Sequence, residues 1–179
     1  MAGVLLSLSA AAHADDDAVF FQQTLTLINQ QRAKANARPV TLDDKLMKIS
    51  GEWAVKKAEA GDLIHRKEFT VLLNQLRYSY LNENIYFYSE KPTADRVITA
   101  WMNSAGHRRN LLQDRVDRIG LGRARGGDGY YVVFNGADSR PPERSDHAPA
   151  RANSPRMKPN SLLALTVSTL LAARRTLRR

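Results

Sequence analysis

Apolar residues recur at helical spacing near the start of the chain and predict two helices there. The first is expected to start near Asp15–Asp17, where acidic side chains stabilise a helix N-terminus, and to end before Pro39. The second is expected to follow the capping sequence of residues 41–44 and to stop at Gly61. The apolar positions that define the two helices are Val19, Phe20, Leu27, Ile28, Leu46, Ile49 and Trp53.

The pattern between these helices and residue 136 predicts two more helices and a short sheet. A helix is expected over residues 69–76, and another opens at Pro92 and carries Trp101 on its apolar face. Two β-like runs flank a glycine-rich turn and predict a hairpin. The expected strands are 85–87, 119–124 and 130–134, with the turn at 126–129. Trp53 and Trp101 are expected in the core because both occupy apolar helical positions.

The N-terminal residues 1–14 have features of an export signal. They are apolar or small and end in Ala12-His13-Ala14, the small-x-small pattern of signal peptidase sites, before the acidic residues 15–17. We therefore expect export and removal of residues 1–14. The alternative is an apolar N-terminus that frays from the first helix.

The C-terminal segment differs in composition from the body. Residues 137–160 hold five of the seven prolines and are expected to form a disordered linker. Residues 161–179 begin with an apolar stretch and end in four arginines, which favours a short helix with a basic end. Its thirteen apolar-rich residues reach only ~20 Å, so we expect contact with a membrane or envelope surface rather than a span of the ~30 Å bilayer core. A sorting signal and a disordered tail are the alternatives.

Composition supports one packed domain between these ends, at residues 15–136. The chain has 179 residues, of which 43% are hydrophobic and 25% charged, enough for a packed core. The absence of cysteine from the sequence excludes disulfides, zinc–thiolate sites and a cysteine nucleophile. The net charge is +9, but residues 137–179 hold nine basic and three acidic residues, so the body is nearly balanced. We therefore expect no nucleic-acid partner.

The body contains two histidines and one glutamate with the potential to form a site. His65, Glu83 and His107 supply two imidazoles and a carboxylate, a set that can bind zinc or a similar divalent cation with one position open for water. They are separated by 18 and 24 residues, so their spacing alone leaves the role open. The alternative is that each histidine is a surface residue or a hydrogen-bonded polar residue.

The order of several segments resembles the CAP superfamily, whose SCP domain occurs in cysteine-rich secretory proteins, insect antigen 5, plant pathogenesis-related proteins and many bacterial secreted proteins. The resemblance runs from about Phe20 to Asn135, and the lack of cysteine fits the compact bacterial branch. Its most specific segment, residues 101–110, reads Trp-Met-Asn-Ser-Ala-Gly-His-Arg-Arg-Asn. The other segments that carry it are Leu27–Arg32, Leu42–Leu46, His65, Glu83–Ile85, Ile119–Gly122 and Tyr130–Phe134.

The resemblance implies an α+β fold, namely a CAP-type α-β-α sandwich with three to four helices around a small, mainly antiparallel sheet. It also implies a cleft lined by two histidines and two glutamates, of which His65, Glu83 and His107 match three. The second glutamate has no counterpart, because Ser104 stands three residues after the tryptophan of its helix. Asn82 replaces the usual glycine before Glu83, and we expect it to keep a turn because Asn tolerates positive φ. The residues expected to line the cleft are Asn82, Ser104 and Arg108.

These features favour an exported, monomeric ligand-binding or interaction module that is secreted or associated with the cell envelope. The resemblance implies a small or apolar ligand, and the histidines and glutamate imply zinc or another divalent cation. One alternative is a metal-dependent hydrolase with Glu83 as general base, but one glutamate cannot readily both bind the metal and transfer protons. Catalysis is therefore not the favoured interpretation. The other alternative is a structural envelope-interaction domain in which Glu83 accepts hydrogen bonds from His65 or His107 and ties loops together.

Overall fold

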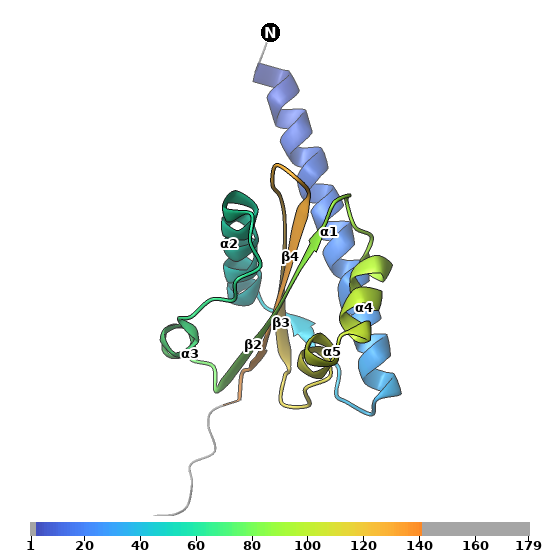
Figure 1. Cartoon of the computed structure of the whole chain (residues 1–179), viewed down its shortest axis with the longest axis vertical. Coiled ribbons are helices and arrows are strands. Elements are labelled where there is room, and N and C mark those ends of the chain that lie inside the picture. The colour runs from blue at the N-terminus through green and yellow to red at the C-terminus, as the bar shows by residue number, and fades with distance from the viewer. Residues whose placement is uncertain (1–2, 141–179) are drawn as a thin grey trace, which may run out of the picture. The chain divides into compact units, whose positions relative to one another are not determined.

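The computed structural model describes the backbone of residues 3–140 and the side chains of residues 15–140. Five helices and four strands lie in this range (Figure 1). The helices are α1 (Gly3–Lys34), α2 (Asp44–Ala60), α3 (Phe69–Leu76), α4 (Ala94–Asn103) and α5 (Ala105–Leu111). The strands are β1 (Thr41–Leu42), β2 (Tyr80–Tyr88), β3 (Arg118–Arg125) and β4 (Tyr130–Asp138).

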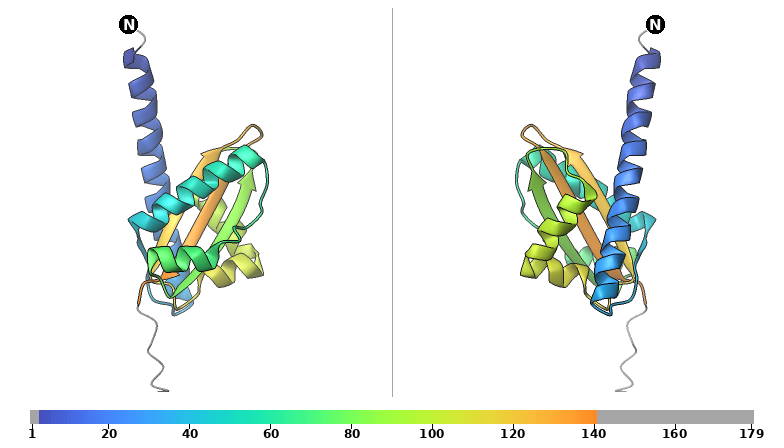
Figure 2. Two further views of the ribbon diagram at one scale, coloured as in Figure 1. Left: turned by 90° about the vertical axis from the view of Figure 1, so that its left-hand side faces the viewer. Right: turned by 90° about the vertical axis from the view of Figure 1, so that its right-hand side faces the viewer.

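The four strands form one sheet that separates two layers of helices. The strand order is β1-β3-β4-β2, in which β1 pairs with β3 in parallel and the other two pairs are antiparallel. Helices α2 and α3 lie on one face of the sheet, and α1, α4 and α5 lie on the other (Figure 1, Figure 2). This arrangement confirms the expected α-β-α sandwich. The described part holds five helices rather than three to four because Ser104, in an extended conformation, separates α5 from α4.

The main apolar core joins α1 and α4 to the sheet. Phe20 and Ile28 of α1 and Trp101 of α4 belong to one buried cluster with Phe134 of β4. The rings of Trp101 and Phe134 meet edge to face, with centroids 6.0 Å apart. Trp101 is fully buried, as predicted, whereas Trp53 is only partly buried and packs against a smaller cluster beneath α2.

Helix α2 lies directly against β3 because two glycines leave room for its backbone. A Cβ atom on Gly120 would lie 2.1 Å from the carbonyl carbon of Leu46, and one on Gly122 would lie 2.2 Å from the carbonyl oxygen of Ser50. Real atoms do not approach so closely, so neither position accepts a side chain at this spacing. The Gly-Leu-Gly sequence therefore sets how closely α2 packs on the sheet.

A buried arginine connects the end of α1 to the segment that follows α5. Arg32 is fully buried and donates hydrogen bonds of 2.6–3.0 Å to four backbone carbonyl groups. These acceptors are Arg38, Leu111, Gln113 and Val116. A buried charge is tolerated when its hydrogen-bonding capacity is met in this way. The contact fixes the C-terminal end of α5, the short helix that carries His107.

Several elements lie where the sequence predicts them. Helix α3 spans the expected residues, and Gly61 ends α2 with a left-handed φ of 67°. Thr93 caps α4 by accepting a hydrogen bond from the backbone of Arg96, as expected for a helix that opens after Pro92. Strands β3 and β4 form the expected hairpin.

The first helix starts earlier than predicted, and the cap of the second lies at Asp43, within the predicted capping sequence of residues 41–44. Helix α1 begins at Gly3, so the acidic residues 15–17 lie inside it; the Ala- and Leu-rich sequence before them favours helix and extends it upstream. Helix α2 is capped by Asp43, whose carboxylate accepts a hydrogen bond from the backbone of Leu46. Residues 41–42, the first half of that capping sequence, instead form β1 beside β3.

The sheet is longer than the sequence predicts at two places. The strand expected over residues 85–87 extends over Tyr80–Tyr88, and Asn82 lies within it rather than in a turn with positive φ. The Asn82 side chain accepts a hydrogen bond from the backbone of Gly136 in β4, which favours the extended conformation. Strand β4 continues through Asp138, two residues past the boundary expected at residue 136.

The predicted linker and terminal helix lie outside the described residues, apart from Ala137–Arg140. Within the part of the chain that the structure describes, no helix is long and apolar enough to cross a membrane.

Candidate functional site

His65 and Glu83 form a pair in which an exposed imidazole ring is hydrogen-bonded to a buried carboxylate. His65 lies in the segment between α2 and α3, and Glu83 lies in β2. His65 Nδ1 is 2.9 Å from Glu83 Oε1, and the two side chains are 53% and 1% exposed. Because a carboxylate only accepts hydrogen bonds, we assign a proton to His65 Nδ1. The neutral ring then keeps an unprotonated Nε2.

Arg66 holds the other oxygen of the same carboxylate. Its Nε donates to Glu83 Oε2 at 2.8 Å, and its backbone amide donates to Oε1 at 3.3 Å. The guanidinium also donates to the carbonyl of Ile49 at 2.8 Å and lies 4.6 Å from the centroid of the Trp53 ring. A buried carboxylate requires such a paired cation. Arg66 is therefore part of the site, although sequence analysis did not single it out.

Asn135 completes the hydrogen bonds around Glu83 from the neighbouring strand. Its amide donates to Glu83 Oε2 at 3.3 Å and to the carbonyl of Asn82 at 3.2 Å, and it accepts a bond from Ser50. Asn135 is directly opposite Glu83 in the register of β2 and β4. The closing strand expected from the sequence ends at Phe134, and only the pairing of β2 with the longer β4 brings Asn135 to Glu83.

A second set of asparagines ties β2 to α5 and positions the backbone of His107. Asn84 donates to the carbonyl of His107 at 3.0 Å, and Asn110 donates to Asn84 at 2.8 Å and to the carbonyl of Glu83 at 3.0 Å. Asn82 donates in turn to the carbonyl of Asn110 at 3.1 Å. Asn82, expected to line a cleft, therefore has a structural role in this network.

The His107 ring is partly buried against Tyr86. The two rings meet edge to face with centroids 6.2 Å apart, and His107 Nδ1 is buried with no hydrogen-bond partner among the described residues. Burial, followed by repulsion from His65, lowers the pKa of His107 below its ordinary value.

Two other residues expected at the cleft have local roles. Ser104 ends α4 and precedes α5 but makes no side-chain capping bond to α5, and Arg108 is exposed and donates to the carbonyl of Met102 at 2.8 Å. A pocket with a volume of about 700 Å³ lies between β2 and α4. Tyr86, which contacts His107, is one of its lining residues.

The donor set limits what kind of metal site can form here. Among residues 15–140, no group of three or more His, Cys, Asp and Glu side chains is arranged to hold a metal ion. Glu83 is surrounded by donors from His65, Arg66 and Asn135, so its oxygens are already used.

The fold is a three-layer sandwich in which a histidine between α2 and α3 pairs with a glutamate on the edge strand β2. The family model described as the CAP, cysteine-rich secretory protein family matches residues 25–135, which is more than half of the chain. The chain therefore belongs to this family.

Similar proteins are known from several bacteria. YkwD of Bacillus subtilis (strain 168), an uncharacterized protein, is 25% identical over 125 residues; the alignment covers 64% of this chain and 46% of that protein, less than half its length. An outer surface protein of Borrelia burgdorferi has a TM-score of 0.56 at 23% identity, over 65% of this chain and 90% of that chain. An extracellular SCP-domain protein of Bacillus anthracis has a TM-score of 0.54 at 21% identity, and the match covers 65% of this chain and 39% of that chain. The two structural likenesses show the fold.

Proposed function

We propose that the protein is an exported binding module whose His65 and His107 rings hold a divalent cation or a polar ligand. The observation that carries the proposal is the exposed His65 ring fixed on the buried Glu83 carboxylate. A carboxylate that accepts a hydrogen bond from one ring nitrogen of a histidine fixes the tautomer and the orientation of the ring. Carboxylates do this for metal-bound histidines in many proteins. His65 Nε2 is thereby prepared to bind a cation or accept a hydrogen bond.

Glu83 acts in this proposal as an orienting residue and not as a direct ligand. A cation would take its protein ligands from His65 and His107 and its remaining ligands from water or a bound molecule. Such a site is more open and weaker than a closed zinc site with four protein ligands. The bonds to Glu83 also leave it unavailable as a general base, which favours binding over hydrolysis.

The exposed residues beside His65 favour a ligand with an apolar part. Leu63 and Ile64 immediately precede His65 and are 46% and 60% exposed. Large apolar side chains exposed next to a polar group are a common feature of binding surfaces. We therefore propose that an organic ligand directs a polar group to His65 and contacts these two side chains.

The proposed location is outside the cell or at the envelope. Two proteins of the same fold are described as an outer surface protein and an extracellular protein, and residues 1–14 have the pattern of an export signal. Fractionation of cells that express the full chain tests this location. Recovery of the protein in the cytoplasm alone would contradict it.

Zinc titration of the full chain by calorimetry tests the site. We expect saturable binding that is lost in His65→Ala and His107→Ala, while circular dichroism shows both variants folded. Glu83→Gln, which removes the charge but keeps an acceptor, is expected to weaken binding by about 10- to 100-fold. His147→Ala is the matched control, because it removes a histidine that lies outside the described residues.

Two results would contradict the binding proposal. One is zinc binding that is unchanged in His65→Ala and His107→Ala but lost in His147→Ala. The other is no zinc binding to the folded parent together with no shift of its His65 and His107 NMR signals when small carboxylate or phosphate ligands are added. Either result would leave the His65–Glu83 pair as a purely structural link between loops.

A further inference from the structure

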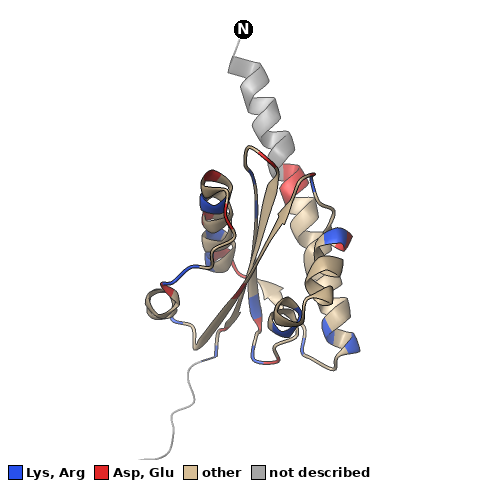
Figure 3. Ribbon diagram, in the orientation of Figure 1, with Lys and Arg blue, Asp and Glu red and all other residues tan. Residues whose placement is uncertain are grey.

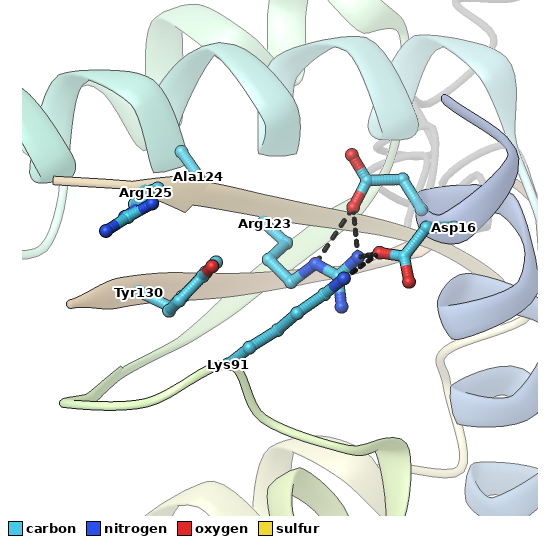
Figure 4. A pocket seen from close by; sticks show the side chains of 7 residues that line it. Asp16, Lys91, Arg123, Ala124, Arg125 and Tyr130 are labelled. Atoms are coloured by element: carbon cyan, nitrogen blue, oxygen red, sulfur yellow. Dashed lines mark hydrogen bonds and ion pairs between the residues drawn. The ribbon is translucent and has the colours of Figure 1, made fainter. Parts of the chain in front are cut away.

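Two acidic residues of α1 are held by cations from two other parts of the fold. Arg123 of β3 donates from Nε to Asp17 Oδ1 at 2.8 Å and from a terminal nitrogen to Asp16. Lys91, which precedes α4, places Nζ 2.7 Å from Asp16 Oδ2. Figure 4 shows the side chains of Arg123, Lys91 and Asp16 converging. We call Asp16, Asp17, Lys91 and Arg123 the N-terminal clamp.

Arg123 is built into the fold rather than placed on its surface. Its side chain is 5% exposed, and its guanidinium lies 4.3 Å from the centroid of the Phe20 ring. The charge of a buried arginine must be compensated, and here the two aspartates supply that compensation. The hydrogen bond from Lys91, followed by the charge of Arg123, holds the pKa of Asp16 below its usual value despite an opposing effect of burial. Asp16 is thus charged at neutral pH.

The clamp lies where the expected export signal ends. Asp16 and Asp17 come two and three residues after Ala14, the last residue of the small-x-small pattern. Among the side chains that the structure describes, Asp16 is the first along the chain to form an ion pair. Figure 3 shows the corresponding acidic segment of α1 beside the sheet.

Residues 15–17 lie at a different place along α1 in the uncut chain and in the cut chain, so the helix dipole acts on their charges differently. In the uncut chain α1 starts at Gly3, so residues 15–17 lie inside the helix. Hydrolysis adds water across the Ala14–Asp15 bond, leaving a carboxylate on Ala14 and an ammonium on Asp15. The three aspartates then occupy the first helical turn, where negative charge is favourable. A new chain end frays unless it is tied to the body.

We propose that the N-terminal clamp anchors a chain end made by signal-peptidase cleavage between Ala14 and Asp15. The inference rests on the export part of the proposed function and is independent of ligand binding at His65. It assigns Arg123 and Lys91 a role in holding the second and third residues of the cut chain on the sheet. Without them the first turns of the shortened helix would open.

The test compares cut and uncut forms of the full chain. The exported protein is isolated, its mass is measured, and amide hydrogen exchange is followed in residues 15–24. The uncut form is Ala14→Leu, whose bulky side chain blocks cleavage, extracted in mild detergent. Arg123→Gln is introduced into both forms. The matched control is Arg125→Gln, since Arg125 lines the same pocket but forms no ion pair with the two aspartates.

We expect a mass that corresponds to a start at Asp15. In the cut form, Arg123→Gln should speed exchange in residues 15–24 by about tenfold, whereas Arg125→Gln should change it by less than about twofold. In the uncut form, the effect of Arg123→Gln should be under about threefold because the helix continues upstream. Asp17→Asn is a milder variant that should act in the same direction if Arg123→Gln does not fold.

Three outcomes would overturn the inference, each in a recognisable way. If the exported protein retains residues 1–14, the proposed cleavage is contradicted, while the proposed zinc binding is unaffected. If Arg123→Gln and Arg125→Gln change amide exchange equally in the cut protein, the proposed anchoring role of the clamp is contradicted, while the proposal of export is unaffected. An equal effect of Arg123→Gln in cut and uncut forms makes the clamp an ordinary packing contact of α1.

Discussion

At the scale of single residues, the burial of Glu83 depends on several neighbours at once. Its carboxylate is 1% exposed and accepts bonds from His65, Arg66 and Asn135. Arg66 balances the charge, and Asn135 adds a neutral donor from β4. Removal of any one donor leaves lone pairs that water cannot easily reach. The same arrangement fixes the His65 ring, so stability and the proposed binding depend on shared contacts.

His107 gives this region a pH dependence with a definite sign. Its pKa is lowered in the folded protein, chiefly by burial, relative to the value near 6.5 expected in the unfolded chain. Below that value the unfolded chain takes up the proton first, so the free energy of unfolding should fall as the pH decreases. Above it both states are neutral, and this contribution is constant.

Urea unfolding at pH 7.5 and pH 5.5, with a chelator present, measures this effect. The parent should lose more stability between the two pH values than His107→Gln, which cannot bind the proton. All other titratable residues are the same in the two proteins, so the difference between the two losses reports on His107. Equal losses in the two proteins would show that His107 is not the group responsible.

At the scale of elements, the contact between α2 and β3 determines how the segment before His65 is placed. The backbone of α2 touches β3 at Gly120 and Gly122, and its C-terminal turn ends at Gly61. His65 follows four residues later, and Arg66 reaches back to the carbonyl of Ile49 in α2. The position of the helix therefore controls the position of the His65–Arg66 segment.

Gly120→Ala should disrupt this contact. The new Cβ would lie 2.1 Å from the backbone of Leu46, so α2 must move away from the sheet. We expect a loss of about 3 kcal/mol in the free energy of unfolding. Gly127→Ala is the matched control, because no heavy atom lies within 4 Å of a Cβ there; its effect should stay within about 1 kcal/mol. Urea unfolding of both variants checks the difference, and similar values would contradict this account.

At the scale of the whole molecule, the folded body extends to the end of β4. Ala137 and Asp138 are buried, and their carbonyls accept hydrogen bonds from the backbones of Asp117 and Ser79 at 3.0 Å. Arg140 also pairs with the Asp138 carboxylate. The body therefore reaches past residue 136.

Two truncated chains test this boundary. A chain that ends at Arg140 should unfold cooperatively with nearly the parent midpoint, because it keeps the contacts that β4 makes with the other described residues. A chain that ends at Gly136 should lose about 2–4 kcal/mol, since it lacks two buried residues and two backbone hydrogen bonds. Thermal and urea unfolding measure both. If the shorter chain is as stable as the longer one, Ala137 and Asp138 are not part of the folded body.

The chain that ends at Arg140 also tests the predicted envelope contact of residues 161–179, because it lacks them. Cell fractionation should show that this chain no longer associates with the envelope.

The amino-acid pattern alone was enough to predict the family, most of the helices and strands, and the histidines and glutamate of the site. Periodicity and capping place α3 and the start of α4, because these depend on neighbouring residues. Local sequence failed at Asn82, where a turn was expected. A bond from Gly136, 54 residues away, favours the extended backbone there.

Only the tertiary structure decided how the site residues are used. Asn135 meets Glu83 through the register of β2 and β4, and Arg66 turns towards Glu83 and Trp53. The clamp likewise joins residues more than 100 positions apart, Asp16 and Arg123. The chemical type of each group is fixed by the sequence. The bonds that it makes depend on which strands and helices lie beside it, and that follows from packing of the whole chain.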